Sequence, residues 1–140
     1  MQDFLRDLLV CLNQSSPNIY LKQRPGNAHI QSLIDLKIKT FDDCIPYLKA
    51  LIPDQFSHHQ ASTLPHEAAA KRHLWIFGVV VGKPPSGNKP GKKQRAAYVK
   101  IQLGRTALEA VCISFHRPTS PLLFPFSAAY HTHFDSIYHA

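Results

Sequence analysis

Residues 74–81 read LWIFGVVV, a continuous run of aromatic and β-branched side chains with the length of a buried strand. Residues 97–103 read AYVKIQL, and their apolar and polar side chains alternate as they do in a half-buried strand. A third run, LEAVCISF at residues 108–115, is again rich in strand-forming residues. These runs predict the central strands of a sheet, and the fold class that we expect is mainly β with flanking helices (α+β).

Two features suggest that this sheet curls into a small β-barrel. Gly78 lies in the middle of the first run, and a glycine within a strand often marks a bulge or a sharp bend. Between the first two runs, residues 83–95 read KPPSGNKPGKKQR, whose prolines and glycines predict a long basic loop. A barrel needs further strands, and we expect one from residues 126–138 or from residues 33–39.

The rest of the chain predicts short elements around this sheet. Residues 3–14 form an amphipathic N-terminal helix, because apolar side chains recur along one helical face. Residues 126–138 fit either a fourth strand or a closing helix. The remaining expectations are a strand at 19–22, a turn at 24–27, a half-buried strand at 34–39 or a helix at 30–36, a helix at 44–52 capped by Asp43, and a linker at 55–73 with a helical turn at 65–71.

The length of 140 residues predicts one domain, and its apolar content of 44% is enough for a core. Within it we expect four parts. They are an N-terminal part of helix and strand (1–54), a linker (55–72), the core strands of the barrel (73–116) and a closing segment (117–140).

The charge is very uneven along the chain, whose formal net charge is +7. Residues 1–70 carry six Lys/Arg and seven acids, whereas residues 71–140 carry ten Lys/Arg and only two acids, Glu109 and Asp135. This asymmetry predicts a polyanionic partner for the second half. Nucleic acid is the first candidate, and an anionic membrane surface is the weaker alternative.

Tyr98 and Lys100 share the polar face of one predicted strand. An aromatic ring beside a cation suits single-stranded nucleic acid, because its bases stack and its phosphates are anionic. In the oligonucleotide-binding (OB) barrel the first long loop and strands 2 and 3 contribute to the binding surface, and here these are residues 83–95, 97–103 and 108–115. The residues that we expect to bind nucleic acid are Lys83, Lys89, Lys92, Lys93, Arg95, Tyr98, Lys100 and Arg105.

Residues 73–116 are similar in layout to the first three strands of OB domains in the middle subunit of replication protein A, and in telomere-capping relatives of the CST and terminin type. The shared layout is a hydrophobic strand with a glycine (76–80), a variable loop, a strand that ends in a short glycine turn (99–104), and a strand entered by an acidic or small residue (108–113). The similarity covers roughly a third of the chain. It departs from the family at the turn 103–107, where Arg105 stands in place of the usual acids.

The resemblance implies an OB-fold accessory subunit that binds single-stranded DNA in a replication or telomere-capping complex, on chromosomes in the nucleus. It also implies other protein subunits and a hetero-oligomer. Candidate partner contacts are the apolar face of the N-terminal helix and the Pro-rich aromatic segment, which could instead be intramolecular core. These residues are Phe4, Leu5, Leu8, Leu9, Leu12, Leu122, Phe124 and Phe126. The alternative function is a protein–protein adaptor with the same OB-like fold and no direct nucleic-acid contact.

Other classes of protein have little support in the sequence. No run approaches the roughly 20 apolar residues of a membrane span, and residues 1–12 lack the cleavage site of a secretory signal. Three cysteines, far apart, fit a reducing compartment better than a disulfide scaffold. The sequence contains no GxSxG, GxGxxG or P-loop motif, so we expect neither an enzyme nor a cofactor.

Cys112 and His116 are the residues to consider for other chemistry. On a regular strand they would share a face at a separation of roughly 13 Å, which is too far for proton transfer between them. Together with His131 and His133 they include the ligand types that zinc accepts, but the spacing matches no closed structural site. We therefore expect no bound metal.

Overall fold

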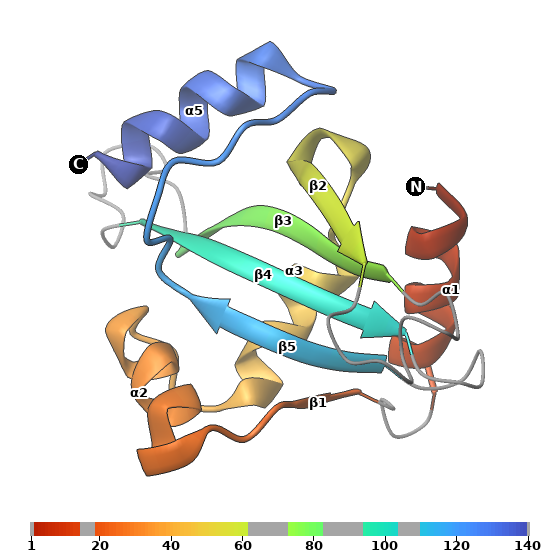
Figure 1. Cartoon of the computed structure of the whole chain (residues 1–140), viewed down its shortest axis with the longest axis vertical. Helices are drawn as coiled ribbons and strands as arrows, with labels where there is room; N and C mark the ends of the chain where they lie inside the picture. Colours follow the sequence, from red (N-terminus) through yellow and green to blue (C-terminus); the bar gives the residue numbers. More distant parts are fainter. Residues whose placement is uncertain (1, 15–18, 62–72, 83–93, 104–109, 140) are drawn as a thin grey trace, which may run out of the picture.

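The computed structural model describes residues 2–14, 19–61, 73–82, 94–103 and 110–139. Their strands form one sheet, and their helices lie around it (Figure 1). The elements are α1 (Gln2–Leu12), β1 (Ile19–Leu21), the 3-10 turn η1 (Pro25–Asn27), α2 (Ala28–Asp35), the 3-10 turn η2 (Phe41–Cys44), α3 (Ile45–Lys49), the 3-10 turn η3 (Pro53–Gln55), β2 (Phe56–Ala61), β3 (His73–Val81), β4 (Arg95–Leu103), β5 (Ala110–His116) and α5 (Ala128–Tyr138).

The five strands form one sheet in the order β1-β5-β4-β3-β2. β1 runs parallel to β5, and the other neighbours are antiparallel. The three strands predicted from the sequence are therefore the three central ones. β1 and β2 are the two edges of the sheet among the described residues, so these strands form an open α+β sheet and do not close into the barrel that we expected.

Both edge strands come from the first half of the chain. β1 confirms the short strand predicted at residues 19–22. The prediction of a linker at 55–73 is wrong for residues 56–61, which form β2, while residues 62–72 lie outside the described part of the chain. His58, His59 and Gln60 are exposed, because an edge strand with one open face needs little apolar surface. That composition resembles a linker when it is judged from the sequence.

Of the two alternatives for this segment, the helix predicted at residues 30–36 is confirmed and the strand at 34–39 is wrong, because residues 28–35 form helix α2. Leu33, Leu36 and Ile38 are buried and Ile34 is exposed. Leu33 is the buried residue of the helix itself, whereas Leu36 and Ile38 follow its end. The chain reverses at Lys37, whose φ of 59° is left-handed. The alternation that suggested a strand therefore spans a helix end and the turn after it.

For residues 126–138 the sequence left two alternatives, a fourth strand or a closing helix, and the structure decides between them. Residues 128–138 form the helix α5, not a fourth strand. The side chain of Ser127 caps it by accepting a hydrogen bond from the Tyr130 backbone N–H at 3.0 Å. α5 lies across the top of the sheet in Figure 1.

The larger core lies between the sheet and the helices α1 and α3, and α3 is seen behind the strands in Figure 1. Phe4 of α1 stacks on Trp75 and Phe77 of β3, with ring centroids 4.8 and 5.8 Å apart. Val99 and Ile101 of β4 are buried in the same core. We call this side of the sheet the back face.

Most of the apolar residues that we expected to contact a partner are buried within the chain itself. Phe4, Leu8 and Leu12 are buried in the back-face core, and Leu5 packs against it. Leu122 and Phe124 are buried in a second core with α5. This burial supports the intramolecular alternative for those six residues and leaves Leu9 and Phe126 as the exposed members of the set.

The second core occupies one half of the opposite face, which we call the front face. Its buried members come from β3, β4, α5 and the segment before α5, and they are Ile76, Ala96, Leu122, Phe124 and Phe134. A Cβ on Gly78 would lie 2.4 Å from the Phe124 ring and 2.9 Å from the Phe134 ring. Pairing of β3 with β4 continues through Gly78 without a register shift, so the predicted bulge is wrong. Gly78 makes room for these two rings.

Candidate nucleic-acid interface

The front face carries two rows of side chains that cross the strands. Lys100 of β4 is paired with Ile76 of β3 and Ser114 of β5, and Ile76 is in turn paired with His58 of β2. In the neighbouring row, Tyr98 lies between Gly78 and His116. The rows bring polar residues from three strands onto one surface.

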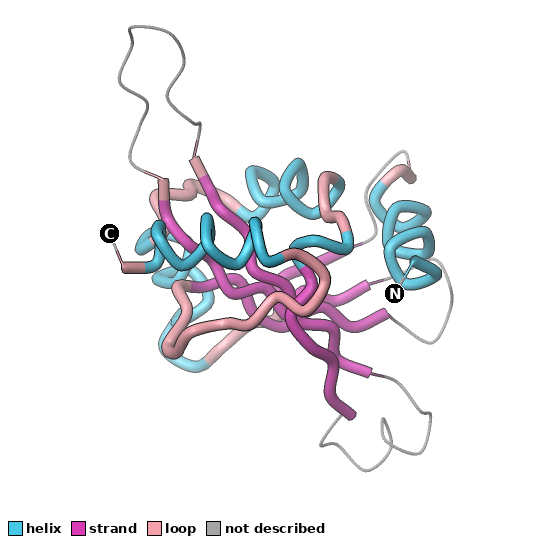
Figure 2. Tube along the Cα trace, turned by 90° about the horizontal axis from the view of Figure 1, so that it is seen from above, coloured by secondary structure: helices cyan, strands magenta, loops and turns pink. Residues whose placement is uncertain are grey.

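α5 covers only part of this face. Figure 2 shows the strands running beneath α5 as one twisted layer. Ile76 is fully buried under the second core, whereas Lys100, Ser114 and His116 stay half-buried. We call the half of the front face around Lys100, Ser114 and His116 the open half.

Lys100 is the electrostatic centre of the open half. Burial lowers the pKa of its ammonium, and the nearby positive charges of Arg24 and Lys22 lower the pKa further. None of these three cations is in an ion pair with a carboxylate among the described residues. The fold therefore gathers three like charges, one of them half-buried, without a described counter-charge.

Arg24 reaches this surface from the turn after β1. Its Nη2 donates hydrogen bonds to the carbonyl oxygen of Ile113 at 2.9 Å and to Oγ of Ser114 at 3.4 Å. Ser114 is the β5 residue paired with Lys100. The guanidinium is thus held beside the row that contains Lys100, at the edge where β1 and β5 run parallel.

An aromatic pair lies next to the cations. The rings of Tyr98 and His116 stack with centroids 4.9 Å apart and an interplanar angle of 15°. The Lys100 Nζ lies 5.8 Å from the centroid of the Tyr98 ring, within the range of a cation–π contact. Burial raises the pKa of the Tyr98 hydroxyl, so the ring is neutral at physiological pH.

Two further polar groups belong to the same face. His58 on β2 is exposed at its surface side, and its pKa is lowered first by partial burial and then by the charges of Lys100 and His59. Gln102 follows Lys100 on the same side of β4, is only 3% exposed, and its Nε2 has no hydrogen-bond partner among the described residues. An unpaired buried amide is costly to the folded chain.

Of the residues predicted to bind nucleic acid, the structure brings Tyr98 and Lys100 together. Arg95 starts the same strand and lines a separate 140 Å³ cleft with Arg117 and Tyr138. The other five predicted residues lie outside the described part of the chain, and they are Lys83, Lys89, Lys92, Lys93 and Arg105.

Five residues of the open half and its rim were missed from the sequence, namely Lys22, Arg24, His58, Ser114 and His116. Lys22 and Arg24 belong to the half of the chain with balanced charge, so composition directed attention elsewhere. They lie close to Lys100 because β1 pairs in parallel with β5, and no local sequence pattern predicts that pairing. A short strand that ends in two nearby cations is the only signal that the sequence offers.

The structure corrects the geometry assumed for Cys112 and His116. Register shifts within β5, because Ile101 pairs with Cys112 whereas Lys100 pairs with Ser114. The extra residue turns Cys112 to the back face and His116 to the front face. Burial raises the pKa of the Cys112 thiol. Within the described ranges, no group of three or more His, Cys, Asp or Glu side chains could hold a metal ion.

Comparison with known proteins adds no relative. No family model matches the chain, and neither a curated protein nor a solved structure matches it. The resemblance to OB domains therefore remains a prediction. Among the described helices, none has the length and apolar character needed to span a membrane.

Proposed function

We propose that the chain binds single-stranded nucleic acid on the open half of the front face. Lys22, Arg24 and Lys100 contact phosphates, and the stacked pair of Tyr98 and His116 offers aromatic surface to a base. Single-stranded nucleic acids are bound on surfaces that combine these two elements.

One observation carries this proposal. Lys22 and Arg24 lie close to the half-buried ammonium of Lys100, and no described carboxylate forms an ion pair with any of the three. Like charges raise the free energy of the folded chain unless a counter-charge is present. A polyanion supplies that counter-charge and returns the pKa of Lys100 towards its usual range.

The proposal does not depend on a closed OB barrel, because all of these groups lie on one face of an open sheet. It extends to an accessory subunit in a replication or chromosome-end complex in the nucleus, assembled with other protein subunits. That extension is supported by the resemblance of residues 73–116 to OB domains and by the basic charge of the second half of the chain.

The test compares two double variants of equal charge change. Arg24→Gln with Lys100→Gln removes two cations of the open half. Arg6→Gln with Lys49→Gln removes two exposed cations of α1 and α3, which pack on the back face. Fluorescence anisotropy with labelled oligo(dT) and oligo(U) measures affinity at several salt concentrations.

We expect the wild type and the back-face variant to bind with the same dependence on salt. The open-half variant should bind more weakly, and the slope of log K against log salt should fall by about 1.4, at about 0.7 for each phosphate contact on a single strand. Equal affinities and equal slopes for the two double variants would contradict the proposal. The two oligonucleotides show whether DNA or RNA is preferred.

A second candidate function, a protein adaptor without nucleic-acid contact, is favoured by two apolar side chains. Leu123 is 71% exposed and Phe126 is 59% exposed, and both precede α5. Leu123 also lines a 270 Å³ cleft with Ser57 and His58. If Leu123→Ser with Phe126→Ser releases a copurifying protein subunit while oligonucleotides fail to bind the wild type, the adaptor function replaces the first proposal.

A further inference from the structure

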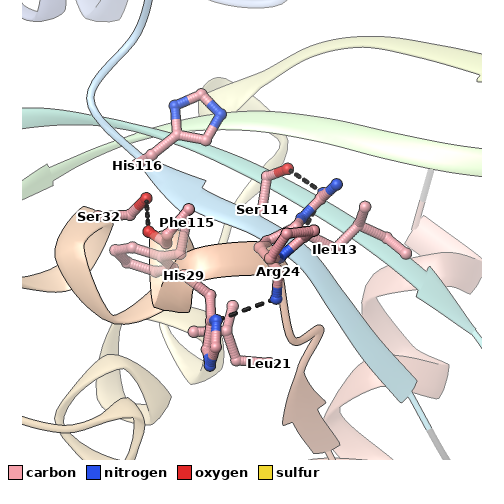
Figure 3. Close-up of a pocket in the computed structure, with 10 residues that line it drawn as sticks. Leu21, Arg24, His29, Ser32, Ile113, Ser114, Phe115 and His116 are labelled. Carbon is pink, nitrogen blue, oxygen red and sulfur yellow. Dashed lines mark hydrogen bonds between the residues drawn. The ribbon is translucent and has the colours of Figure 1, made fainter.

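A cleft with a volume of about 440 Å³ lies beside the open half, between α2 and the last residues of β5 (Figure 3). β1 pairs with β5 only as far as Cys112, so the edge of β5 beyond that residue has no neighbouring strand among the described residues. α2 packs against this edge and leaves the cleft. Its volume is within the range of small-molecule sites.

The walls of the cleft combine apolar and polar groups. Leu21, Pro25 and Ala28 contribute apolar surface. Arg24, His29, Ser114 and His116 contribute polar groups from three different segments of the chain. Ligand sites combine apolar walls with a few convergent polar groups that orient the ligand, and this cleft offers both kinds of surface.

The hydrogen bonds around the cleft determine what each polar group can still offer. The Arg24 side chain is held by the Ile113 carbonyl and Ser114 Oγ through Nη2 alone, so its other N–H groups remain for an anion. The Arg24 backbone N–H donates to His29 Nδ1 at 3.0 Å, as the dashed line in Figure 3 shows. Neutral His29 therefore carries its proton on Nε2 and is a donor there.

His116 has the opposite tautomer. Its Nδ1 lies 2.6 Å from the Arg117 carbonyl oxygen, which only accepts, so Nδ1 carries the proton and Nε2 is an acceptor. When both imidazoles are neutral, the cleft offers a fixed cation in Arg24, a donor in His29 Nε2 and an acceptor in His116 Nε2. Inorganic phosphate would use only Arg24 and His29. A nucleotide also has N–H or O–H groups that can donate to His116, and it has a base that can pack on the apolar walls.

We infer that this cleft binds one nucleotide unit, with its phosphate on Arg24 and His29 and its base against the apolar wall and His116. The inference rests on the proposed function, since His116 both lines the cleft and stacks on Tyr98 at the border between the open half and the second core. A single-stranded nucleic acid that lies across Lys100 would place one nucleotide in the cleft and the neighbouring nucleotides on the sheet.

The experiment titrates the full chain with uridine 5′-monophosphate, adenosine 5′-monophosphate, uridine and inorganic phosphate, using calorimetry and backbone amide NMR shifts. We expect the nucleotides to shift the resonances of residues 113–116 and 28–32. They should bind roughly tenfold more tightly than either uridine or phosphate, which corresponds to about 1.4 kcal/mol. Nucleotides that bind no more tightly than both fragments would overturn the inference.

Two variants locate the site. Arg24→Gln should weaken nucleotide binding about tenfold through loss of the charged hydrogen bonds, and Arg6→Gln on α1 should leave it unchanged. Because Arg24 also holds the β5 edge, Ala28→Phe serves as a second variant that fills the cleft without removing those bonds, and it should abolish binding. Nucleotide affinity equal to wild type in both Arg24→Gln and Ala28→Phe would overturn the inference.

The outcomes separate the inference from the proposed function. If oligonucleotides bind through Lys100 but mononucleotides shift no resonance of the cleft, the nucleotide site fails and the proposed function stands. If mononucleotides bind in the cleft while the wild type binds no oligonucleotide at low salt, the proposed function fails and the nucleotide site stands.

Discussion

The two halves of the front face lie on the same strands, but one half is covered by other segments of the chain and the other is left open. At one half, Ile76 and Gly78 are covered by Phe124 and Phe134, so apolar side chains from distant segments close the surface. At the other half, Lys100 remains half-buried beside two more cations, and no described helix covers it. One half has its packing partners within the chain, and the other half has groups that suit an external partner.

The difference arises within single strands. Ile76 and Lys100 are cross-strand neighbours, yet Ile76 is fully buried and Lys100 is not. Covering Lys100 fully would cost the desolvation of an unpaired charge, whereas covering Ile76 is favourable. Substitutions in the covered half should therefore reduce stability, and a neutral substitution of Lys100 should not.

The largest effect on stability is expected from Gly78→Ala. The new methyl group would overlap the rings of Phe124 and Phe134, and overpacking of this kind costs about 1–3 kcal/mol. Strand backbone by itself prefers alanine to glycine, so any loss of stability reports the steric contact. Urea denaturation of the variant and the wild type gives the free energies of unfolding.

The matched control is the same substitution in a chain with Phe124→Leu. The smaller side chain leaves room at the ring position, so the cost of Gly78→Ala should fall in this background. A double-mutant cycle measures that coupling. If Gly78→Ala increases the stability of the wild type, α5 and the segment before it do not cover this half as described.

The central strands could be predicted from sequence because their side chains carry the signal locally. β3 is a continuous apolar run and β4 alternates, and both patterns are set by burial on the faces of a sheet. β2 was missed because an edge strand with exposed histidines has no such pattern. The same limitation concealed the open sheet, since the positions of β1 and β2 decide whether its edges meet.

In the candidate site, too, some residues could be predicted from the local sequence and others could not. Tyr98 and Lys100 are two residues apart on one strand, so strand geometry alone predicts that they share a face. Arg24 and Ser114 are 90 residues apart and meet only through the pairing of β1 with β5. His116 joined the front face through a register shift within β5 that no composition signal marks.

A smaller loss of stability is expected from Tyr130→Phe in the covered half. The Tyr130 hydroxyl of α5 donates a 2.7 Å hydrogen bond to the Gly78 carbonyl oxygen, and burial raises the pKa of that hydroxyl to about 12. Removing the hydroxyl leaves a carbonyl oxygen without this donor, which costs about 1 kcal/mol. Tyr20→Phe on the exposed side chain of β1 is the control and should change the free energy of unfolding by less than about 0.5 kcal/mol. Equal effects of the two substitutions would argue that α5 is not anchored by this bond.

The smallest effect, and the one of opposite sign, is expected from Lys100→Met in the open half. Since folding lowers the pKa of Lys100, the charged form is less favourable in the folded chain than in the unfolded one. That cost is present in full below the folded pKa and disappears as pH rises through the unfolded value of about 10.4. Lys100→Met should therefore raise stability at pH 7 by less than about 1 kcal/mol, because water screens a half-buried charge.

The pH dependence decides whether this gain comes from charge. The advantage of Lys100→Met over the wild type should shrink between pH 7 and pH 10.5, as the wild-type ammonium loses its proton. Lys49→Met on α3, an exposed lysine on the other side of the sheet, should show no such trend. A constant advantage at every pH would attribute the gain to packing of the methionine, and a loss of stability at pH 7 would mean that Lys100 is already compensated within the chain. In either case the contrast between the two halves would no longer rest on unpaired charge.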